Sequence, residues 1–308
     1  MRILVTGGAG FLGSHMSDLL IAKGHEVLAL DNLYTGSESN IIHLVDHKKF
    51  QFVRHDITTP LDYECDLIMN FACPASPIHY QRDPVQTIKT NIHGAINVLE
   101  LANRLNVPIF QASTSEVYGD PNVHPQPESY WGNVNPIGPR ACYDEGKRAA
   151  ETLFFDYYRQ HNVKIKVARI FNTYGPRMAI DDGRVVSNFI VAALRSRDLT
   201  IYGDGSQSRS LCYVDDLLQG IYNFVYECDY IGPLNLGTTF EVSMEYLANI
   251  IIKLTNSNSK IIKLPLPEND PKQRRPDLTL AEMKIGWRPQ ISIEDGLIKT
   301  IEYFRKVV

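Results

Sequence analysis

The chain has 308 residues, of which 44% are hydrophobic and 21% are charged, and its formal net charge is -4 at pH 7. This length suits one large domain or two modest ones, and the composition excludes a disordered or fibrous protein. A weakly negative chain offers no general attraction for nucleic acid, so any anion that it binds must be met by local cations.

The cysteines and the apolar runs indicate the cellular compartment of the protein. Five cysteines are scattered along the sequence without a Cys-x-x-Cys pair, namely Cys65, Cys73, Cys142, Cys212 and Cys228. This pattern argues against a disulfide framework or a zinc site, so we expect no metal and a reducing compartment. The N-terminus does not resemble a targeting segment, and no apolar stretch is long enough to span a membrane. We therefore expect a cytoplasmic protein without a membrane partner.

The N-terminal region has the order strand, glycine turn, helix and strand. Residues 2–6 and 26–30 are short apolar runs, and residues 14–22 carry apolar side chains at helical spacing. Glycines in the turn permit positive φ or a close approach to a ligand, and the helix N-terminus offers N–H groups to a pyrophosphate. The residues predicted to bind a dinucleotide here are Gly7, Gly10, Phe11, Leu12 and Gly13.

Asp31 ends the second strand, about twenty residues beyond the turn, where a carboxylate can bind the adenosine ribose. It favours NAD over NADP, because its charge would repel a 2'-phosphate. The alternative is that Asp31 is only a turn residue. The polar turn that contains Asn32, Thr35 and Gly36 is placed to close over the adenosine side.

Two more apolar strands are predicted at residues 50–55 and 66–71. The carboxyl ends of parallel strands meet at one edge of the sheet, where ligands bind. We therefore expect Asp56 and Ile57 to flank the adenine and Ala72 to line the middle of the cofactor. Asp56 could equally be a helix cap.

Polar residues follow the next predicted strand, residues 107–112. Thr114, Ser115 and Glu116 bring two hydroxyls and a carboxylate to the same edge as the glycine turn. Capping of a helix is the alternative reason for polar residues at this place.

Tyr143 and Lys147 are four positions apart in a stretch predicted to be helical, so they share one face of the helix. A neighbouring cation favours the phenolate form of tyrosine, whose isolated pKa is about 10. To make Tyr143 a base at neutral pH, Lys147 and a cationic cofactor ring would need to lower that pKa by about 3 units, or about 4 kcal/mol. Tyr-x-x-x-Lys also occurs by chance on many helices.

Two long helices are predicted, one at residues 84–106 and one that carries Tyr143 and continues beyond it. Their apolar faces are broader than one face of a sheet requires, so we expect them to pack against their copies in a homodimer.

A final strand is predicted at residues 164–170, and the strand-helix alternation weakens beyond it. We expect an α/β fold with a Rossmann-type doubly wound parallel sheet. Residues 1–172 would form the cofactor-binding domain. Residues 173–308 would form a smaller C-terminal α/β substrate-binding domain, some of whose segments return to the sheet.

With the glycine turn, Thr114, Tyr143 and Lys147 in this order, the chain resembles the extended short-chain dehydrogenase/reductase superfamily over nearly its whole length. Within it, four strings resemble the UDP-glucuronic acid decarboxylases, also called UDP-xylose synthases. They are residues 74–77, 113–121, 130–148 and 182–189. The resemblance implies conversion of UDP-glucuronate to UDP-xylose with bound NAD. The C4 hydroxyl is oxidised, the resulting β-keto acid loses CO2, and the ketone is reduced again.

The resemblance also implies catalytic roles. Tyr143 takes the C4 proton, Lys147 lowers the pKa of Tyr143 and holds the nicotinamide ribose, and Thr114 hydrogen-bonds the C4 oxygen. Glu116 acts near C5 and C6 when the enolate is reprotonated.

Substrate contacts are implied in the same way. Arg274 meets the sugar ring and its carboxylate, although Arg275 could take this role. Arginine suits a diphosphate because its planar fork donates hydrogen bonds in pairs. The remaining substrate contacts are Ser115, Asn172, Arg184, Asn188, Gln207 and Arg209.

Three alternatives to the decarboxylase fit these residues less well. A nucleotide-sugar 4,6-dehydratase usually has an aspartate where this chain has Ser115, whose hydroxyl is a poor acid. A 4-epimerase usually has no carboxylate at the position of Glu116. A non-enzymatic NAD-binding regulator keeps the fold without the chemistry, but such proteins often lose the tyrosine or the lysine that this chain has. The decarboxylase is therefore the favoured interpretation.

Overall fold

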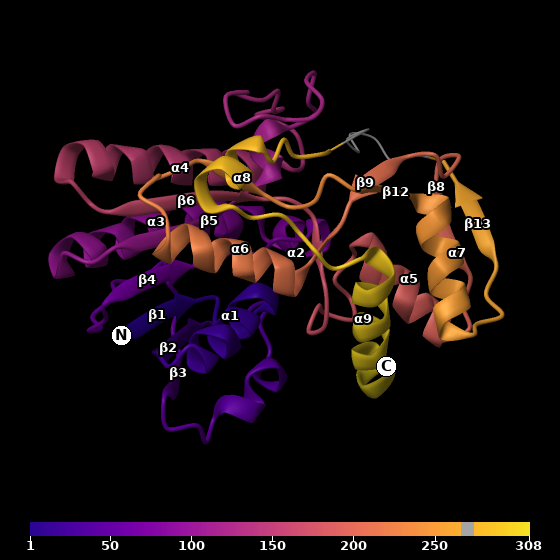
Figure 1. The fold of residues 1–308 in the computed structure, drawn as a ribbon, viewed down its shortest axis with the longest axis horizontal. Coiled ribbons are helices and arrows are strands. Elements are labelled where there is room, and N and C mark those ends of the chain that lie inside the picture. Colours follow the sequence, from indigo (N-terminus) through magenta and orange to yellow (C-terminus); the bar gives the residue numbers. More distant parts are fainter. Residues whose placement is uncertain (266–273) are drawn as a thin grey trace.

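The computed structural model describes residues 1–265 and 274–308, and its centre is a seven-stranded parallel sheet (Figure 1). The strand order is β11-β6-β5-β4-β1-β2-β3, so the direction of winding reverses between β1 and β4. The strands are β1 (Arg2–Thr6), β2 (Glu26–Asp31), β3 (Phe50–Arg54), β4 (Leu67–Asn70), β5 (Ile109–Thr114), β6 (Ile165–Ile170) and β11 (Leu234–Leu236). The predicted Rossmann-type doubly wound sheet is confirmed.

Helices cover both faces of this sheet, and further helices, α5 (Val185–Leu194), α7 (Met244–Thr255) and α9 (Ile293–Val307), belong to the C-terminal part (Figure 1). The other helices in the described ranges are α1 (Phe11–Ala22), α2 (Pro77–Arg82), α3 (Pro84–Leu105), α4 (Ala141–His161), α6 (Val214–Tyr226), α8 (Thr279–Ile285) and the 3-10 turns η1 (Glu38–Asn40), η2 (Ile42–Leu44) and η3 (Ser115–Tyr118). None of the helices within the described ranges is both long and apolar enough to cross a bilayer.

Each central strand divides its side chains between two hydrophobic cores, because successive residues of a strand point to opposite faces. Ile3 and Val5 join the core on the side of α1 and α6, whereas Leu4 and Ile68 join the core on the side of α3 and α4. All four side chains are fully buried. The near-continuous apolar runs of the sequence thus mark strands that are covered on both faces.

The long helices α3 and α4 begin and end where the local sequence requires. Asp83 precedes α3 and accepts the N–H of Gln86, and Pro84 stands in the first turn, where no intrahelical donor is needed. Both helices end at an asparagine in the left-handed region, Asn106 with a φ of 53° and Asn162 with a φ of 57°. The two helices pack against each other and hold Tyr143 and its neighbours over the sheet edge.

The C-terminal part extends to the right of the main sheet in Figure 1. It contains three two-stranded sheets, in which β7 pairs with β10, β8 with β13 and β9 with β12. Their strands are β7 (Thr173–Tyr174), β8 (Leu199–Tyr202), β9 (Ser208–Ser210), β10 (Cys212–Tyr213), β12 (Glu241–Ser243) and β13 (Ile261–Leu264). One hydrophobic core runs from the α1 and α6 side of the main sheet into this part through Phe189, Leu199 and Leu247.

The strand β11 comes from the C-terminal half of the sequence and pairs in parallel with β6 of the main sheet. Element ends differ from the sequence predictions by a few residues. The first helix, for example, begins at Phe11 rather than at residue 14, because Gly10 already stands at its N-cap. How the binding of two ligands is divided between residues 1–172 and 173–308 stays a prediction.

Candidate active site

The glycine turn between β1 and α1 allows a ligand to lie against the backbone. Gly7 has a φ of +67°, in the region that favours glycine, and a Cβ on Gly13 would lie 2.1 Å from the carbonyl oxygen of Gly7. Gly10 stands at the N-cap of α1, and no side chain in the described ranges caps this helix. The N–H groups of the first turn of α1 are therefore available to an anion.

Asp31 stands at the end of β2 and is tied to the glycine turn. Its carboxylate accepts the N–H of Ala9 at 3.0 Å and the N–H of Leu33 at 2.8 Å. Burial raises the pKa of Asp31, and the backbone hydrogen bonds act against that rise. A Cβ on Gly36 would lie 2.7 Å from a carboxylate oxygen of Asp31, so Gly36 leaves room for this carboxylate. Asp31 is thus both a turn residue and a carboxylate placed at the cavity.

Asp56 also has a structural task. Its Oδ1 accepts hydrogen bonds from the N–H and the hydroxyl of Thr58, at 2.9 and 2.8 Å, and its Oδ2 accepts the amide of Asn32 at 3.0 Å. These bonds hold the turns that follow β2 and β3 next to each other at the cavity wall.

A cavity of about 970 Å³ opens at the carboxyl ends of the sheet strands and reaches the C-terminal part. Nearly all the predicted site residues line it. They are Gly7, Gly10, Phe11, Leu12, Gly13, Asp31, Asn32, Thr35, Asp56, Ile57, Ala72, Thr114, Ser115, Glu116, Tyr143, Lys147, Asn172, Arg184, Asn188, Gln207, Arg209 and Arg274. Gly36 does not line the cavity and acts through the space that it leaves for Asp31.

Tyr143 and Lys147 lie on the buried face of α4, with relative exposures of 5% and 4%. The Nζ of Lys147 donates to the carbonyl oxygen of Ala112 at 2.8 Å and lies 5.8 Å from the centre of the Tyr143 ring. Burial raises the pKa of Tyr143, while a hydrogen bond with Thr114 acts to lower it. Burial lowers the pKa of Lys147.

Burial is the largest effect of the protein on the pKa of Tyr143, and it raises this pKa. That Lys147 and a cationic cofactor ring lower the pKa of Tyr143 stays a prediction. The four-residue spacing placed both side chains on one face of the helix, as predicted. It did not reveal that both side chains are buried, and burial disfavours the charged phenolate.

Thr114 ends β5, lines the cavity and forms a hydrogen bond with the backbone. Its Oγ1 accepts the N–H of Glu116 at 3.2 Å, which caps η3. The same hydroxyl hydrogen-bonds with the phenol of Tyr143. Helix capping, the alternative reason for these polar residues, is therefore real, and it fixes the hydroxyl that faces Tyr143.

Glu116 forms ion pairs with two arginines from distant segments. Arg140, just before α4, donates to Oε2, and Arg274 donates to Oε1. Arg274 also donates to the carbonyl oxygen of Gly119 at 3.3 Å, and its side chain is 7% exposed. Arg275 instead pairs with Glu241 at 3.3 Å. The arginine that reaches the Glu116 carboxylate is therefore Arg274 rather than Arg275.

Arg140 was missed as a site residue, although it lies within the string that resembles the decarboxylases. It also approaches Asp144, with 3.9 Å between its Nε and a carboxylate oxygen. Asp144 is 6% exposed, and its Oδ1 accepts no hydrogen bond from the residues that the structure describes. Burial raises the pKa of Asp144 to about 7.

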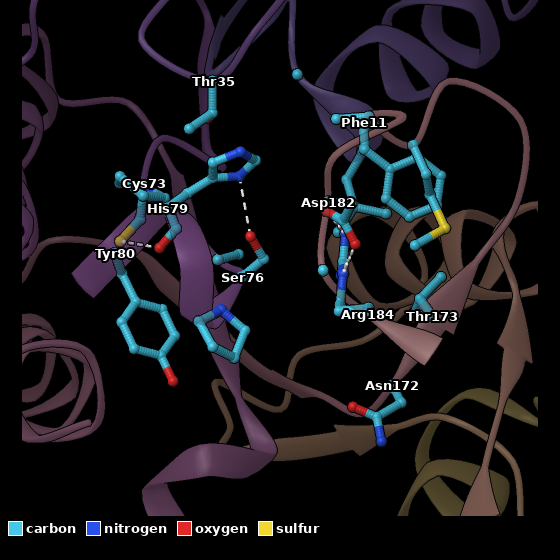
Figure 2. Close-up of a pocket in the computed structure, with 18 of the residues that line it drawn as sticks. Phe11, Thr35, Cys73, Ser76, His79, Tyr80, Asn172, Thr173, Asp182 and Arg184 are labelled. Atoms are coloured by element: carbon cyan, nitrogen blue, oxygen red, sulfur yellow. Dashed lines mark hydrogen bonds and ion pairs between the residues drawn. The ribbon is translucent and has the colours of Figure 1, made fainter. Parts of the chain in front are cut away.

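Figure 2 shows a wall of the cavity that the sequence did not reveal, formed by Ser76, His79 and Tyr80 of the α2 segment. The ring of Tyr80 is stacked on that of Tyr143, with 5.0 Å between the centroids and 5° between the planes. Ser76 and His79 are joined by a hydrogen bond of 2.9 Å. The spacing of aromatic residues could have suggested the stack only after α2 and α4 were known to be neighbours.

Arg184 faces this wall from the other side of the cavity, beside Phe11 (Figure 2). Its guanidinium is paired with Asp182 through two hydrogen bonds, of 2.5 and 2.9 Å. The carboxylate of Asp182 orients Arg184, and this pairing could not be recognised from the sequence. Asn172, at the end of β6, also points into the cavity.

The predicted residues at the far end of the cavity are held by backbone groups. Gln207 donates to the carbonyl oxygen of Tyr202 at 3.0 Å, and Arg209 donates to that of Ser208 at 2.9 Å. The Oε1 of Gln207 is buried and has no hydrogen-bond partner among the described residues. Asn188 donates to the carbonyl oxygen of Gly183 at 3.0 Å. These residues bring polar groups of the C-terminal part to the same cavity.

A family model described as "NAD dependent epimerase/dehydratase family" matches residues 3–237. The chain belongs to this family. It is 53% identical over 306 residues to UDP-glucuronic acid decarboxylase 5 of Arabidopsis thaliana, covering 99% of this chain and 89% of the relative. It is 50% identical over 305 residues to UDP-glucuronic acid decarboxylase 1 of Xenopus tropicalis, covering 99% of this chain and 72% of the relative. The resemblance that the motifs predicted is confirmed.

Solved structures of two nucleotide-sugar 4-epimerases share the fold. A UDP-glucuronic acid 4-epimerase from Bacillus cereus, in complex with UDP-glucuronic acid and NAD, matches with a TM-score of 0.89 and 27% identity over 100% of both chains. A UDP-glucose 4-epimerase from Thermotoga maritima, with UDP-glucose, matches with a TM-score of 0.89 and 31% identity over 100% of this chain and 99% of that chain.

Proposed function

We propose that this protein decarboxylates UDP-glucuronate to UDP-xylose with NAD that is regenerated in each cycle. The observation that carries the proposal is the placement of Glu116, between Arg140 and Arg274, in the same cavity as Tyr143 and Lys147. In this proposal the redox site and the pair of arginines that would bind the carboxylate share one cavity. The named relatives at 50–53% identity over 99% of the chain support the same activity.

The residues present at the glycine turn fit NAD. A Cβ would fill the space at Gly13, and the uncapped N-terminus of α1 suits a pyrophosphate. Asp31, fixed by Ala9 and Leu33, keeps lone pairs for ribose hydroxyls and disfavours a 2'-phosphate. Bound NAD would supply the hydride acceptor at C4, later the hydride donor, and a positive charge beside the phenol of Tyr143.

At C4 of the sugar, Tyr143 would accept the hydroxyl proton during oxidation and return it during the final reduction. Thr114 would donate to the C4 oxygen, since its hydroxyl already lies at the phenol of Tyr143. Lys147, one helical turn further along α4, would hold the nicotinamide ribose and favour the phenolate. The positive charges must together overcome the burial that raises the pKa of Tyr143.

At C5 and C6, the two arginines would receive the carboxylate of the substrate. This carboxylate has the charge and shape of the Glu116 side chain, so it can replace Glu116 on Arg274 or Arg140. The released Glu116 would then lie near C5, where it can direct the proton that reaches the enolate. Loss of CO2 breaks the C5–C6 bond, the electron pair passes into the C4 enolate, and a proton forms the new C5–H bond.

The nucleotide diphosphate would lie against the C-terminal part of the cavity. Arg184, Arg209 and Asn172 supply donors there, and Gln207 and Asn188 complete the polar lining. In this arrangement residues 1–172 mainly hold NAD and residues 173–308 mainly hold the nucleotide sugar. Two parts of residues 173–308 contribute to the first region instead: Arg274 pairs with Glu116, and β11 pairs with β6 of the main sheet.

The rival reactions fit these residues less well. A 4,6-dehydratase needs a strong acid beside C6, and Ser115, which is 2% exposed in the cavity, does not supply one. A 4-epimerase usually has no carboxylate at the position of Glu116, which in this chain is paired with Arg274 and Arg140. A regulator without chemistry has no use for a buried Tyr143 and Lys147.

The test is incubation of the purified protein with NAD and UDP-glucuronate labelled with ¹³C at C6. We expect labelled CO2 and unlabelled UDP-xylose in equal amounts, and incorporation of one deuterium when the reaction runs in deuterated water. UDP-glucose and dTDP-glucose serve as control substrates. A dehydrated or epimerised product from these controls, with no turnover of UDP-glucuronate, would replace the decarboxylase by one of its rivals.

We also propose that the protein is a homodimer through the outer sides of α3 and α4. Val85 on α3 and Tyr158 on α4 are 61% and 42% exposed, although the two helices pack on each other. Sedimentation equilibrium should give a mass near twice 34.9 kDa. A monomer mass at all concentrations would contradict the dimer and leave the proposed chemistry untouched.

A further inference from the structure

We propose that Gln126 is a positioning residue for Arg274. Gln126 lies in the irregular segment between η3 and α4 and has a relative exposure of 0%. This inference rests on the proposed function, because the effect of Gln126 is measured through the sugar carboxylate that Arg274 would receive. Burial of a whole amide side chain in a loop requires specific partners, and the partners of Gln126 surround the segment that carries Arg274.

The backbone of Gln126 pairs with the segment after Arg274 as a short bridge. Its N–H donates to the carbonyl oxygen of Arg275 at 2.9 Å, and its carbonyl oxygen accepts the N–H of Asp277 at 2.9 Å. The bridge partner of Gln126 is Pro276. Residues 275–277, which directly follow Arg274, are therefore held against Gln126.

The side chain of Gln126 completes this contact. Its Oε1 accepts the N–H of Arg275 at 3.0 Å, and its Nε2 donates to the carbonyl oxygen of Val123 at 2.7 Å. Both ends of the amide are thus used, and one of them fixes the peptide that joins Arg274 to Arg275. A change at this peptide moves the Cα of Arg274 and with it the guanidinium at Glu116.

A second buried amide links the same contact to the main sheet. Asn235 on β11 donates from its Nδ2 to the carbonyl oxygens of Gln126 and Asp277, at 2.9 and 3.2 Å. Its Oδ1 accepts the hydroxyl of Tyr118, which lies in η3 two residues after Glu116. The loop of Gln126, the segment of Arg274 and the turn of Glu116 are therefore fixed to one another through hydrogen bonds between buried groups.

Arg274 and Gln126 therefore have different roles. Arg274 would contact the substrate, whereas Gln126 lies outside the residues that line the cavity and acts only through the position of Arg274. A displacement of about 1 Å in such a group can cost about 100-fold in rate. Loss of the Gln126 amide should therefore weaken binding of the substrate carboxylate and leave binding of the nucleotide unchanged.

The test uses Gln126→Met, which keeps the length of the side chain and removes both of its hydrogen bonds. Calorimetry should show a dissociation constant for UDP-glucuronate raised by roughly 10-fold, which lies within the usual coupling of contacting residues. The dissociation constant for UDP should change by less than about 2-fold. Arg275→Ala is the matched control, since it keeps the backbone N–H that Gln126 accepts and removes only the side chain that pairs with Glu241.

A double-mutant cycle with Arg274→Ala separates positioning from general destabilisation. If Gln126 acts through Arg274, Gln126→Met should have little further effect on UDP-glucuronate affinity once Arg274 is removed. Equal losses in both backgrounds, or equal losses for UDP and UDP-glucuronate, would overturn the inference. Should Gln126→Met fail to fold, Gln126→Asn, which is one methylene shorter, takes its place in the cycle. A wild-type protein that does not turn over UDP-glucuronate would instead refute the proposed function.

Discussion

Arg274 and Glu116 form a buried ion pair across 158 positions of the sequence. Arg140 binds the other oxygen of the same carboxylate, so the three side chains carry a net charge of +1 when all are ionised. Buried charges are costly unless they are paired, and one positive charge of this cluster remains to be balanced whenever Asp144, which lies beside Arg140, is protonated. A substrate carboxylate would balance it. The cluster therefore connects the redox site of Tyr143 with a substrate that carries an acid group.

The substitution Arg274→Ala should reduce kcat/KM for UDP-glucuronate by roughly 30-fold or more, because truncating one partner of a buried charge pair costs about 2–5 kcal/mol. Arg275→Ala should change it by no more than about 3-fold, because the side chain of Arg275 is 34% exposed in its pair with Glu241. Steady-state kinetics of both variants show which of the two arginines contacts the substrate carboxylate. The reverse order would transfer the carboxylate contact from Arg274 to Arg275.

The substitution Tyr143→Phe should lower turnover by about 100- to 10,000-fold, the usual contribution of a positioned general acid-base group. Phe keeps the stack on Tyr80, whose centroid lies 5.0 Å away, so the fold and the cofactor site should persist. Bound nucleotide, measured after denaturation of the purified protein, should match the wild type. Tyr246→Phe on α7 is the control, because Tyr246 is 43% exposed outside the cavity and should retain wild-type turnover. Undiminished turnover in Tyr143→Phe would exclude Tyr143 as the acid-base group.

The fold and the cofactor side were predictable because their signals are local. The glycine turn, Asp31 at the end of β2 and the four-residue spacing of Tyr143 and Lys147 each depend on a few neighbouring residues. Their geometry follows from strand and helix periodicity, and the structure places all of them at one cavity.

The residues that the sequence did not reveal owe their roles to packing between distant segments. Tyr80 matters because α2 brings its ring onto Tyr143, and Gln126 because its loop meets the segment of Arg274. The pKa of Tyr143 shows the same limit. Helical spacing fixes which face the phenol occupies, but burial of that face depends on the whole fold and raises the pKa of Tyr143.

Asp31 should set the preference for NAD over NADP. Asp31→Ala should weaken NAD binding and reduce the ratio of the NAD and NADP affinities by about 10-fold or more, since a direct hydrogen bond and a repulsive charge are lost together. Gly36→Ala offers a matched change, because its Cβ would lie 2.7 Å from the Asp31 carboxylate and displace it without removing its charge. Equilibrium dialysis of both nucleotides measures the ratio. An unchanged ratio in Asp31→Ala would assign Asp31 to the turn alone.

Asp144 should make the stability of the protein fall as the pH rises. Burial raises the pKa of Asp144 from 3.8 to about 7, with Arg140 acting against the rise. Between about pH 4 and pH 7 the folded state therefore holds a proton that the unfolded state has lost. The free energy of unfolding decreases through this window as pH rises, and the full penalty remains above pH 7. Below pH 4 both states are protonated at this group and the effect disappears.

Asp144→Asn should remove this penalty, because an amide does not ionise. The advantage of the variant over the wild type in free energy of unfolding should grow by roughly 1–3 kcal/mol from about pH 5 to about pH 8. This size follows from about 1.4 kcal/mol per unit of pKa shift. Urea unfolding of both proteins at the two pH values gives this double difference. Asp156→Asn is the control on the same helix, because Asp156 is 53% exposed in a surface pair with Arg159 and should show no comparable gain. A gain of equal size at both pH values would mean that Asp144 is ionised throughout, and the cluster of Glu116, Arg140 and Arg274 would then lack the spare positive charge for a substrate carboxylate.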